Sequence, residues 1–198
     1  MDDQLLAAAA AGDVAAITSA LDAGANVDAR DATGRTALLA ATIAGRTDAV
    51  RTLVEAGADV DLQDDRQDNP FLYAGAEGML DILRLVNEAG ADPTLTNRFG
   101  GTALIPASER GHVAVVRYLL NETDIDVDHV NRLGWTALLE AIILGDGDTA
   151  HQDVVDLLIE NGADVDRADK DGVRPLTQAR NRGQTAIARA LEEAGSQP

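Results

Sequence analysis

Between Asp31 and Gln63 the apolar residues fall into two short runs, each spaced like one face of a helix and each followed by a glycine. The runs cover residues 37–44 and 48–56. The apolar positions that set the spacing are Leu38, Leu39 and Ala41 in the first run and Val50, Leu53 and Val54 in the second. Glycine is common just past the end of a helix. The pattern therefore predicts two short helices, over 37–44 and 48–56.

The residues around this helix pair have turn chemistry. Asp31 can hydrogen-bond its own backbone and Gly34 can take a positive φ, so we expect a tight hairpin tip over 31–34. Thr36 is suited to cap the first helix. The segment 58–61 should then lead in an extended conformation to the next turn.

The same pattern returns 33 residues later and keeps returning to the end of the chain. Units of this length cannot bury their apolar faces alone, so they stack on one another. We predict one domain over 1–198, made of an N-terminal cap at 1–30, internal repeats at 31–63, 64–96, 97–130 and 131–168, and a C-terminal cap at 169–198. The surface of such a stack usually carries its function, which indicates binding.

Two short motifs mark each unit, G-x-T-A-L at the first helix and G-A-D-V-D after the second. They return as N-P-F-L-Y-A with G-A-D-P-T, as G-T-A-L-I-P-A with D-I-D-V-D, as G-W-T-A-L-L-E-A with G-A-D-V-D, and as G-V-R-P-L-T-Q-A. Together they resemble the ankyrin repeat, whose signature is T-P-L-H-x-A with a period of 33. The resemblance implies an all-α ankyrin-repeat solenoid of about six helix-turn-helix repeats joined by short β-hairpin-like fingers. Leu39 stands where the family usually has histidine, so the hydrogen bonds of that histidine between repeats should be missing.

Three irregularities interrupt the repeat. Gln67 stands in the place of Gly34, so this finger should change its turn type or carry strain of roughly 1 to 2 kcal/mol. Pro106 should distort the first turn of its helix, because it has no N–H to donate to the carbonyl of Thr102. The unit 131–168 has five extra residues, which we expect to form a projecting loop over 145–150.

The composition narrows the choice of partner. The chain has 16 basic and 34 acidic residues, a net charge of −18, and no cysteine. Such a charge repels nucleic acid and anionic membranes and favours a partner with a basic surface. The acidic start of the chain, unlike a signal peptide, favours the cytoplasm. We expect a monomer with no cofactor and no metal.

Positions that vary between repeats identify the candidate binding surface. The resemblance places variable finger residues and the exposed side of the first helices in the family's usual binding surface. The candidate partner-binding residues are Arg66, Tyr73, Arg98, Phe99, Glu109, Arg110, Arg132, Leu133, Trp135 and Glu140. Buried aromatic and Arg anchors carry most interface energy, which favours Phe99 and Trp135. The alternative is that Trp135 packs across Gly101 and Phe99 covers a hairpin.

Catalytic patterns are poor. His112 follows a glycine, as is common in the family, and we expect a structural role for it. His151 and the aspartates around it lack the spacing of a calcium loop. Glu109 and Glu140 could form a carboxylate pair, but no nucleophile accompanies them and a solvated groove is expected.

The sequence therefore favours a non-enzymatic protein-binding module that uses a concave groove and the fingers. One alternative is an acidic inhibitor or nucleic-acid mimic that occupies a basic cleft of its target. An enzyme using Glu109 or Glu140, with a shifted pKa and a small-molecule pocket, and oligomerisation through the cap faces are further alternatives.

Overall fold

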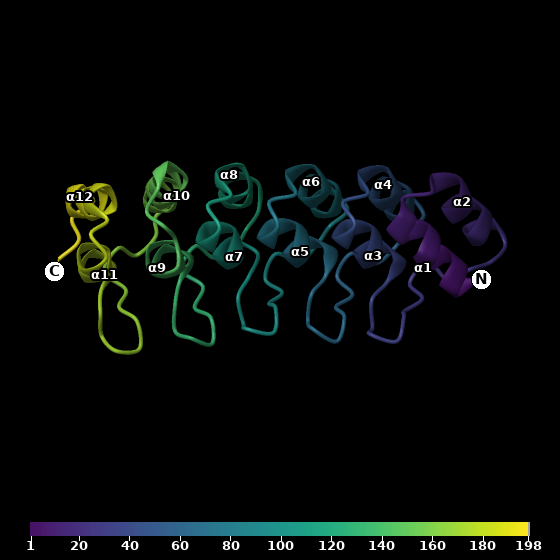
Figure 1. Cartoon of the computed structure of the whole chain (residues 1–198), viewed down its shortest axis with the longest axis horizontal. Coiled ribbons are helices and arrows are strands. Elements are labelled where there is room, and N and C mark those ends of the chain that lie inside the picture. Colours follow the sequence, from purple (N-terminus) through teal and green to yellow (C-terminus); the bar gives the residue numbers. More distant parts are fainter. Residues whose placement is uncertain (198) are drawn as a thin grey trace. The chain divides into compact units, whose positions relative to one another are not determined.

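The computed structural model describes residues 1–197, and this part of the chain forms twelve α-helices (Figure 1). They are α1 (Asp2–Ala11), α2 (Val14–Asp22), α3 (Ala37–Ile43), α4 (Thr47–Glu55), α5 (Pro70–Ala76), α6 (Leu80–Glu88), α7 (Leu104–Glu109), α8 (Val113–Glu122), α9 (Ala137–Ile143), α10 (Thr149–Glu160), α11 (Pro175–Asn181) and α12 (Thr185–Glu193). The predicted all-α series of helix pairs is confirmed. Within residues 1–197 no helix is both long and apolar enough to cross a membrane.

The contacts divide the chain into two compact units. Unit 1 comprises Met1–Gly75 and Met79–Arg98, and unit 2 comprises Ala76–Gly78 and the chain from Phe99 onward. The single domain over 1–198 stays a prediction.

In each unit the first helix of a pair packs on the first helix of the next pair, and the second helix packs on the second. In unit 1, α1 packs on α3, α2 on α4 and α4 on α6; in unit 2, α7 packs on α9, α9 on α11, α8 on α10 and α10 on α12. Figure 1 shows the two rows of helices within each unit. Leu38, Leu53 and Leu138 are among the fully buried side chains between them. Burying one such leucine is worth about 2 kcal/mol, so the stacked faces supply the main driving force.

The capping threonines fix where the first helices begin. Thr36 Oγ1 accepts from Leu39 N at 3.2 Å, and Thr136 Oγ1 accepts from Leu139 N at 3.3 Å. The finger before α3 is closed by Gly34 N–H donating to Asp31 O at 3.0 Å, with Gly34 at φ 77°. Both predictions for this turn and its cap are confirmed.

The last aspartate of each D-V-D motif, and Asp28 at the end of the equivalent N-V-D, holds the following repeat. Its carboxylate accepts a backbone N–H at 2.9 Å in each case: Asp28 from Asp59, Asp61 from Asp92, Asp128 from Asp164, and Asp166 from Gln197. The first aspartate of the motif bonds locally, as Asp59 does with Asp61 N. Part of the acidity of the chain is therefore used by the scaffold.

A second set of bonds reaches the carbonyls at the ends of the first helices. Three of the donors directly follow the glycine after a first helix: Arg46 donates to Ala10 O at 3.5 Å, His112 to Ala76 O at 3.2 Å and Gln184 to Ile142 O at 3.0 Å. In the repeat with the insertion, His151 has this role and donates to Glu109 O at 2.9 Å. Leu39 is fully buried among apolar side chains, as predicted. The side chains near the ends of the first helices, and not the residue at the Leu39 position, therefore form these polar links between repeats. The structural role predicted for His112 is confirmed.

The insertion in 131–168 is only partly a loop. Helix α10 has 12 residues, whereas α4 and α6 have nine, so the expected loop over 145–150 is wrong from Thr149 onward. Asp148 caps the added turn by accepting from His151 N at 3.0 Å, and the His151 ring lies 2.7 Å from the same carboxylate. The backbone and ring hydrogen bonds of His151 hold the pKa of Asp148 below its usual value. The added turn brings the buried His151 ring to the carbonyl of Glu109.

Pro106 distorts the start of α7, as predicted. The helix begins at Leu104, and the carbonyl of Thr102 accepts from Ile105 N at 3.3 Å rather than from position 106. The carbonyl of Thr136, at the equivalent place, accepts from Glu140 N at 3.0 Å. The buried Thr102 hydroxyl has no hydrogen-bond partner within residues 1–197, because the turn that it would cap is displaced.

Gln67 keeps the turn type of the regular fingers and takes a positive φ of 60°. Gln67 N donates to Asp64 O at 2.9 Å, which matches the bond made by Gly34. Of the two predicted alternatives, a changed turn type or strain, the finger therefore shows the strain of a side chain in the left-handed region.

Replacing Gln67 by glycine should relieve this strain. We expect Gln67→Gly to raise the free energy of unfolding by about 1 kcal/mol, after allowing for the greater backbone freedom of glycine in the unfolded chain. Urea denaturation measures the change. Gly34→Ala is the matched control and should destabilise, because its Cβ would lie 2.8 Å from Asp65 Oδ1 at φ +77°. A loss of stability in Gln67→Gly would show that the Gln67 side chain makes a stabilising contact.

Candidate functional site

The finger before α9 is shaped by Asn131. Its Oδ1 accepts from Leu133 N at 2.9 Å and from Trp135 N at 3.1 Å, and its backbone N–H donates to Trp135 O at 3.0 Å. Asn131 occupies the place of Asp31, and the same turn chemistry operates in both. The turn presents Arg132 and Leu133 at its tip, on a loop that extends from the helices of unit 2 (Figure 1).

Two neighbouring fingers of unit 2 are joined through their backbones. Arg132 N donates to Phe99 O at 2.9 Å, and His129 Nε2 lies 2.7 Å from Gly100 O. Gly100 has a φ of 74°, and a Cβ there would lie 2.9 Å from Arg132 Cγ, so the fingers approach too closely for a larger residue. These bonds fix Phe99 and Leu133 at equivalent places on adjacent fingers.

The apolar side chains at these tips are exposed. Phe99 is 54% exposed and Leu133 is 51% exposed, whereas Trp135 is half-buried. Val130, on the same finger as Leu133, is 40% exposed. The sequence analysis did not single out Val130, although an apolar residue next to a turn was a signal for it. The exposed apolar surface thus centres on Phe99 and Leu133 rather than on Trp135.

Glu140 is not in a solvated groove, contrary to the sequence prediction. It is only 6% exposed, and its Oε1 accepts from Asn131 Nδ2 at 2.6 Å. Gln178 and Asp169 form the same link in the next repeat, where the amide donates to the carboxylate at 2.7 Å and the two residue types are exchanged. Glu140 therefore braces the base of the finger against α9.

The environment of Glu140 favours its neutral form. Burial, and then the negative charge of Glu109, raise the pKa of Glu140 to about 7, while the Asn131 hydrogen bond opposes the shift. The raised pKa thus follows from the packing of Glu140 under the finger. Neither Glu140 nor Glu109 lines the groove between α10 and α12 that is described below.

Arg110 is engaged within unit 2. Its guanidinium donates to Ala76 O at 2.7 Å and to Glu77 Oε1 at 2.5 Å. Glu109 is half-buried, and its carbonyl accepts from His151. Both residues therefore contribute to the links between repeats.

The remaining three predicted site residues lie in unit 1. Arg66 is exposed at its finger tip, Tyr73 is half-buried on α5, and Arg98 forms an ion pair with Asp68 at 3.7 Å. The other seven lie in unit 2, where the two joined fingers collect Phe99, Arg132, Leu133 and Trp135.

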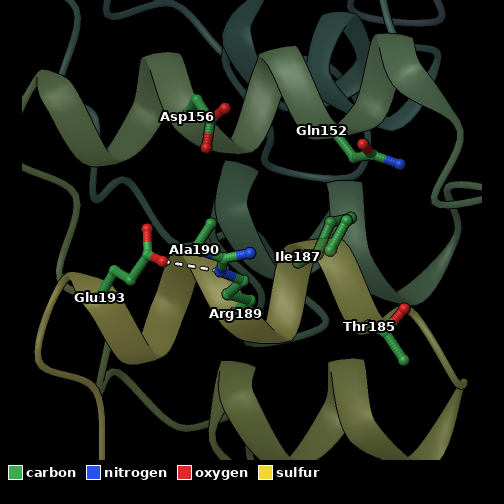
Figure 2. Close-up of a pocket in the computed structure, with 8 residues that line it drawn as sticks. Gln152, Asp156, Thr185, Ile187, Arg189, Ala190 and Glu193 are labelled. Atoms are coloured by element: carbon green, nitrogen blue, oxygen red, sulfur yellow. Dashed lines mark hydrogen bonds and ion pairs between the residues drawn. The ribbon is translucent and has the colours of Figure 1, made fainter.

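An open groove of about 460 Å³ lies elsewhere in unit 2, between α10 and α12. Figure 2 shows Gln152 and Asp156 on α10 facing α12, where Arg189 donates to Glu193 at 2.8 Å. Burial, and the carboxylates around it, raise the pKa of Asp156. None of the predicted site residues lines this groove. Within residues 1–197 no three His, Cys, Asp or Glu side chains are grouped to hold a metal ion.

Replacing Glu140 should change how stability depends on pH. The folded pKa of about 7 lies above 4.5, the ordinary pKa of a glutamate, so the stability contributed by the neutral form is complete below pH 4.5 and is lost as the pH rises through 7. Glu140→Gln keeps the bond to Asn131 and cannot ionise. Relative to the parent, the variant should gain roughly 2 kcal/mol in free energy of unfolding between pH 4.5 and pH 8.

Urea denaturation of both proteins across this range measures the difference. Glu109→Gln is the control, since it removes only the repulsion and should give a smaller gain in the same direction. A stability difference that does not vary with pH would show that Glu140 ionises as it does in water.

Comparisons with known proteins agree with the helix pairs and fingers described above. A model of the family described as ankyrin repeats (3 copies) matches residues 5–97 and 71–169. The ankyrin repeat protein YahD of Escherichia coli (strain K12) is 46% identical over 99 residues, which are 50% of this chain and 49% of YahD. The chain thus spans about half the length of this curated relative.

Two solved structures resemble nearly the whole chain. An ankyrin repeat domain from Acinetobacter baumannii AYE is 53% identical, with a TM-score of 0.94 and 98% of each chain covered. The ankyrin repeat protein EF0377 is 38% identical, with a TM-score of 0.93 and the same coverage. The chain belongs to the ankyrin repeat family.

Proposed function

We propose that this protein is a non-enzymatic binding module that contacts another protein through the two joined fingers of unit 2. Ankyrin repeat domains generally bind other proteins. The observation that carries the site is the exposure of Phe99 and Leu133 on fingers whose backbones are bonded to each other. Large apolar side chains held at the surface of a rigid loop are typical of interface anchors.

The energetics support this assignment. Fully burying a leucine or phenylalanine contributes about 1.5 to 3 kcal/mol, and both side chains are already half-exposed, so a partner can remove the remaining area from water. The hydrogen bonds of Asn131, and the bond from Arg132 N to Phe99 O, hold the backbone in place before binding. Binding to a preorganised loop costs less conformational entropy.

The other predicted residues have roles that support the surface. Arg110 and Glu140 are engaged in bonds within unit 2, and Trp135 is half-buried beside Leu133. We assign these residues to support of the site, and Arg66, Tyr73 and Arg98, which belong to unit 1, are not assigned to it.

The acidic-inhibitor alternative is supported by the net charge of −18. The positions of the aspartates weaken it, because the D-V-D carboxylates accept backbone N–H groups. They keep their charge but are fixed at the repeat junctions. A basic cleft would have to fit the spacing of the repeats themselves.

Removing the two apolar tips should abolish capture of the partner. We expect the double variant Phe99→Ala/Leu133→Ala to lose more than about 2 kcal/mol of binding energy, roughly thirtyfold in affinity, while its melting temperature stays nearly unchanged. The measurement is a pull-down from native lysate, at low and moderate salt, with quantitative mass spectrometry.

Val14→Ala is the matched control, because Val14 is an exposed apolar residue at the start of α2 in unit 1. It should leave capture intact. Capture that survives the double variant and disappears with salt would favour the acidic-inhibitor alternative. A large fall in melting temperature would show that Phe99 and Leu133 belong to the core.

A further inference from the structure

Two positively charged side chains lie across the finger backbones that carry the exposed apolar tips of unit 2. A Cβ on Gly100 would lie 2.9 Å from Arg132 Cγ and 3.6 Å from its Nε, so the Arg132 stem lies across the Phe99 finger. Lys170 lies across the next finger in the same way, since a Cβ on Gly134 would lie 2.5 Å from Lys170 Cγ. The Lys170 ammonium also donates to the carbonyl of Arg132.

Acidic side chains are absent from the chain around these tips. Residues 99–108 and 129–137 contain no aspartate or glutamate, although the chain has 34 acidic residues. The finger over 64–68 in unit 1 has three aspartates and one arginine instead. Lys170 stands on the next finger between two aspartates: Asp169, whose carboxylate accepts from the backbone N–H groups of its own finger, and the exposed Asp171. We call Phe99, Arg132, Leu133 and Lys170 the apolar-basic patch.

The cations of the patch are held in position. The stems of Arg132 and Lys170 rest on glycine backbones, and the ammonium is anchored on a carbonyl. Side chains that are ordered before binding lose less entropy when a partner arrives. At physiological ionic strength the Debye length is about 8 Å, so charges within a finger affect a bound ligand more than the distant aspartates do.

We infer that the apolar-basic patch binds a protein segment in which carboxylates flank an aliphatic or aromatic side chain. This inference rests on the proposed function and specifies the partner of the same site. The apolar side chain of the segment would be buried against Phe99 and Leu133, and its carboxylates would pair with Arg132 and Lys170. The opposite choice, a basic partner, follows only from the total charge of the chain.

A nucleic acid fits the patch less well than an acidic segment does. Binding to a phosphate backbone depends on many neutralised phosphates, and the patch has two cations in a protein with a net charge of −18. Of the two apolar tips, Phe99 alone has an aromatic face on which a base could stack.

The test uses the full chain as bait for a random linear peptide library displayed on phage. We expect the enriched peptides to be acidic and to contain at least one large apolar residue. One representative synthetic peptide is then titrated against the protein, and its affinity should fall with added salt. A single-stranded oligothymidine is titrated in parallel.

Two charge variants test the role of the cations, and Phe99→Ala/Leu133→Ala tests the apolar contact. Arg132→Gln/Lys170→Gln keeps the stems and removes both charges, and it should weaken the peptide about tenfold. Arg117→Gln, an exposed arginine on α8 in the same unit, is the matched control and should change nothing. Thermal melting checks that each variant is folded.

The outcomes distinguish this inference from the proposed function. Basic or uncharged peptides that still need Phe99 and Leu133 would refute the acidic partner and leave the finger site intact. Peptides that bind both double variants, Phe99→Ala/Leu133→Ala and Arg132→Gln/Lys170→Gln, as tightly as the parent would refute the site as well. Enrichment of no peptide, or oligothymidine binding that depends on Arg132 and Lys170, would overturn the inference.

Discussion

Side chains that hydrogen-bond the backbone of a neighbouring repeat are the interaction on which this structure depends. Apolar stacking alone supplies energy without direction, and it leaves the carbonyls at the ends of the short first helices without partners. The side chains of His112, His151 and Gln184 donate to those carbonyls, and the D-V-D aspartates accept the N–H groups of the following repeat. These bonds set the register of each helix pair on the next within its unit.

These hydrogen bonds assign a scaffold role to part of the charge of the chain. Asp28, Asp61 and Asp128 serve the scaffold, and so do all three histidines. The rings of His112 and His151 reach carbonyls of the preceding repeat, and the ring of His129 reaches a carbonyl of its own repeat. The fingers are freer to vary, because the Asx turn at residues such as Asn131 fixes their shape whatever the tip carries. Phe99 and Leu133 can therefore be exposed at little cost to the fold.

The period of the apolar residues and the residue types at the turns were enough to predict the helix pairs, the cap at Thr36 and the irregular turn at Gln67, because these are local consequences of the sequence. Two features depended on side-chain contacts that the repeat pattern does not specify. The role of His151 needed an added helical turn to reach Glu109 O, and the burial of Glu140 needed the Asn131 side chain to fold back onto α9. Of the candidate site, the exposure of Phe99 was predictable, whereas the choice between Leu133 and Trp135 was not, since both flank the same turn.

The most direct test of the account is site-specific photo-crosslinking in the cells that make the protein. A photoreactive amino acid replaces Leu133 in one variant and Arg117, on helix α8, in another. The account predicts a crosslinked partner from the Leu133 position and none from the Arg117 position. A partner crosslinked only from the Arg117 position would contradict the account, because binding would then use α8 rather than the fingers.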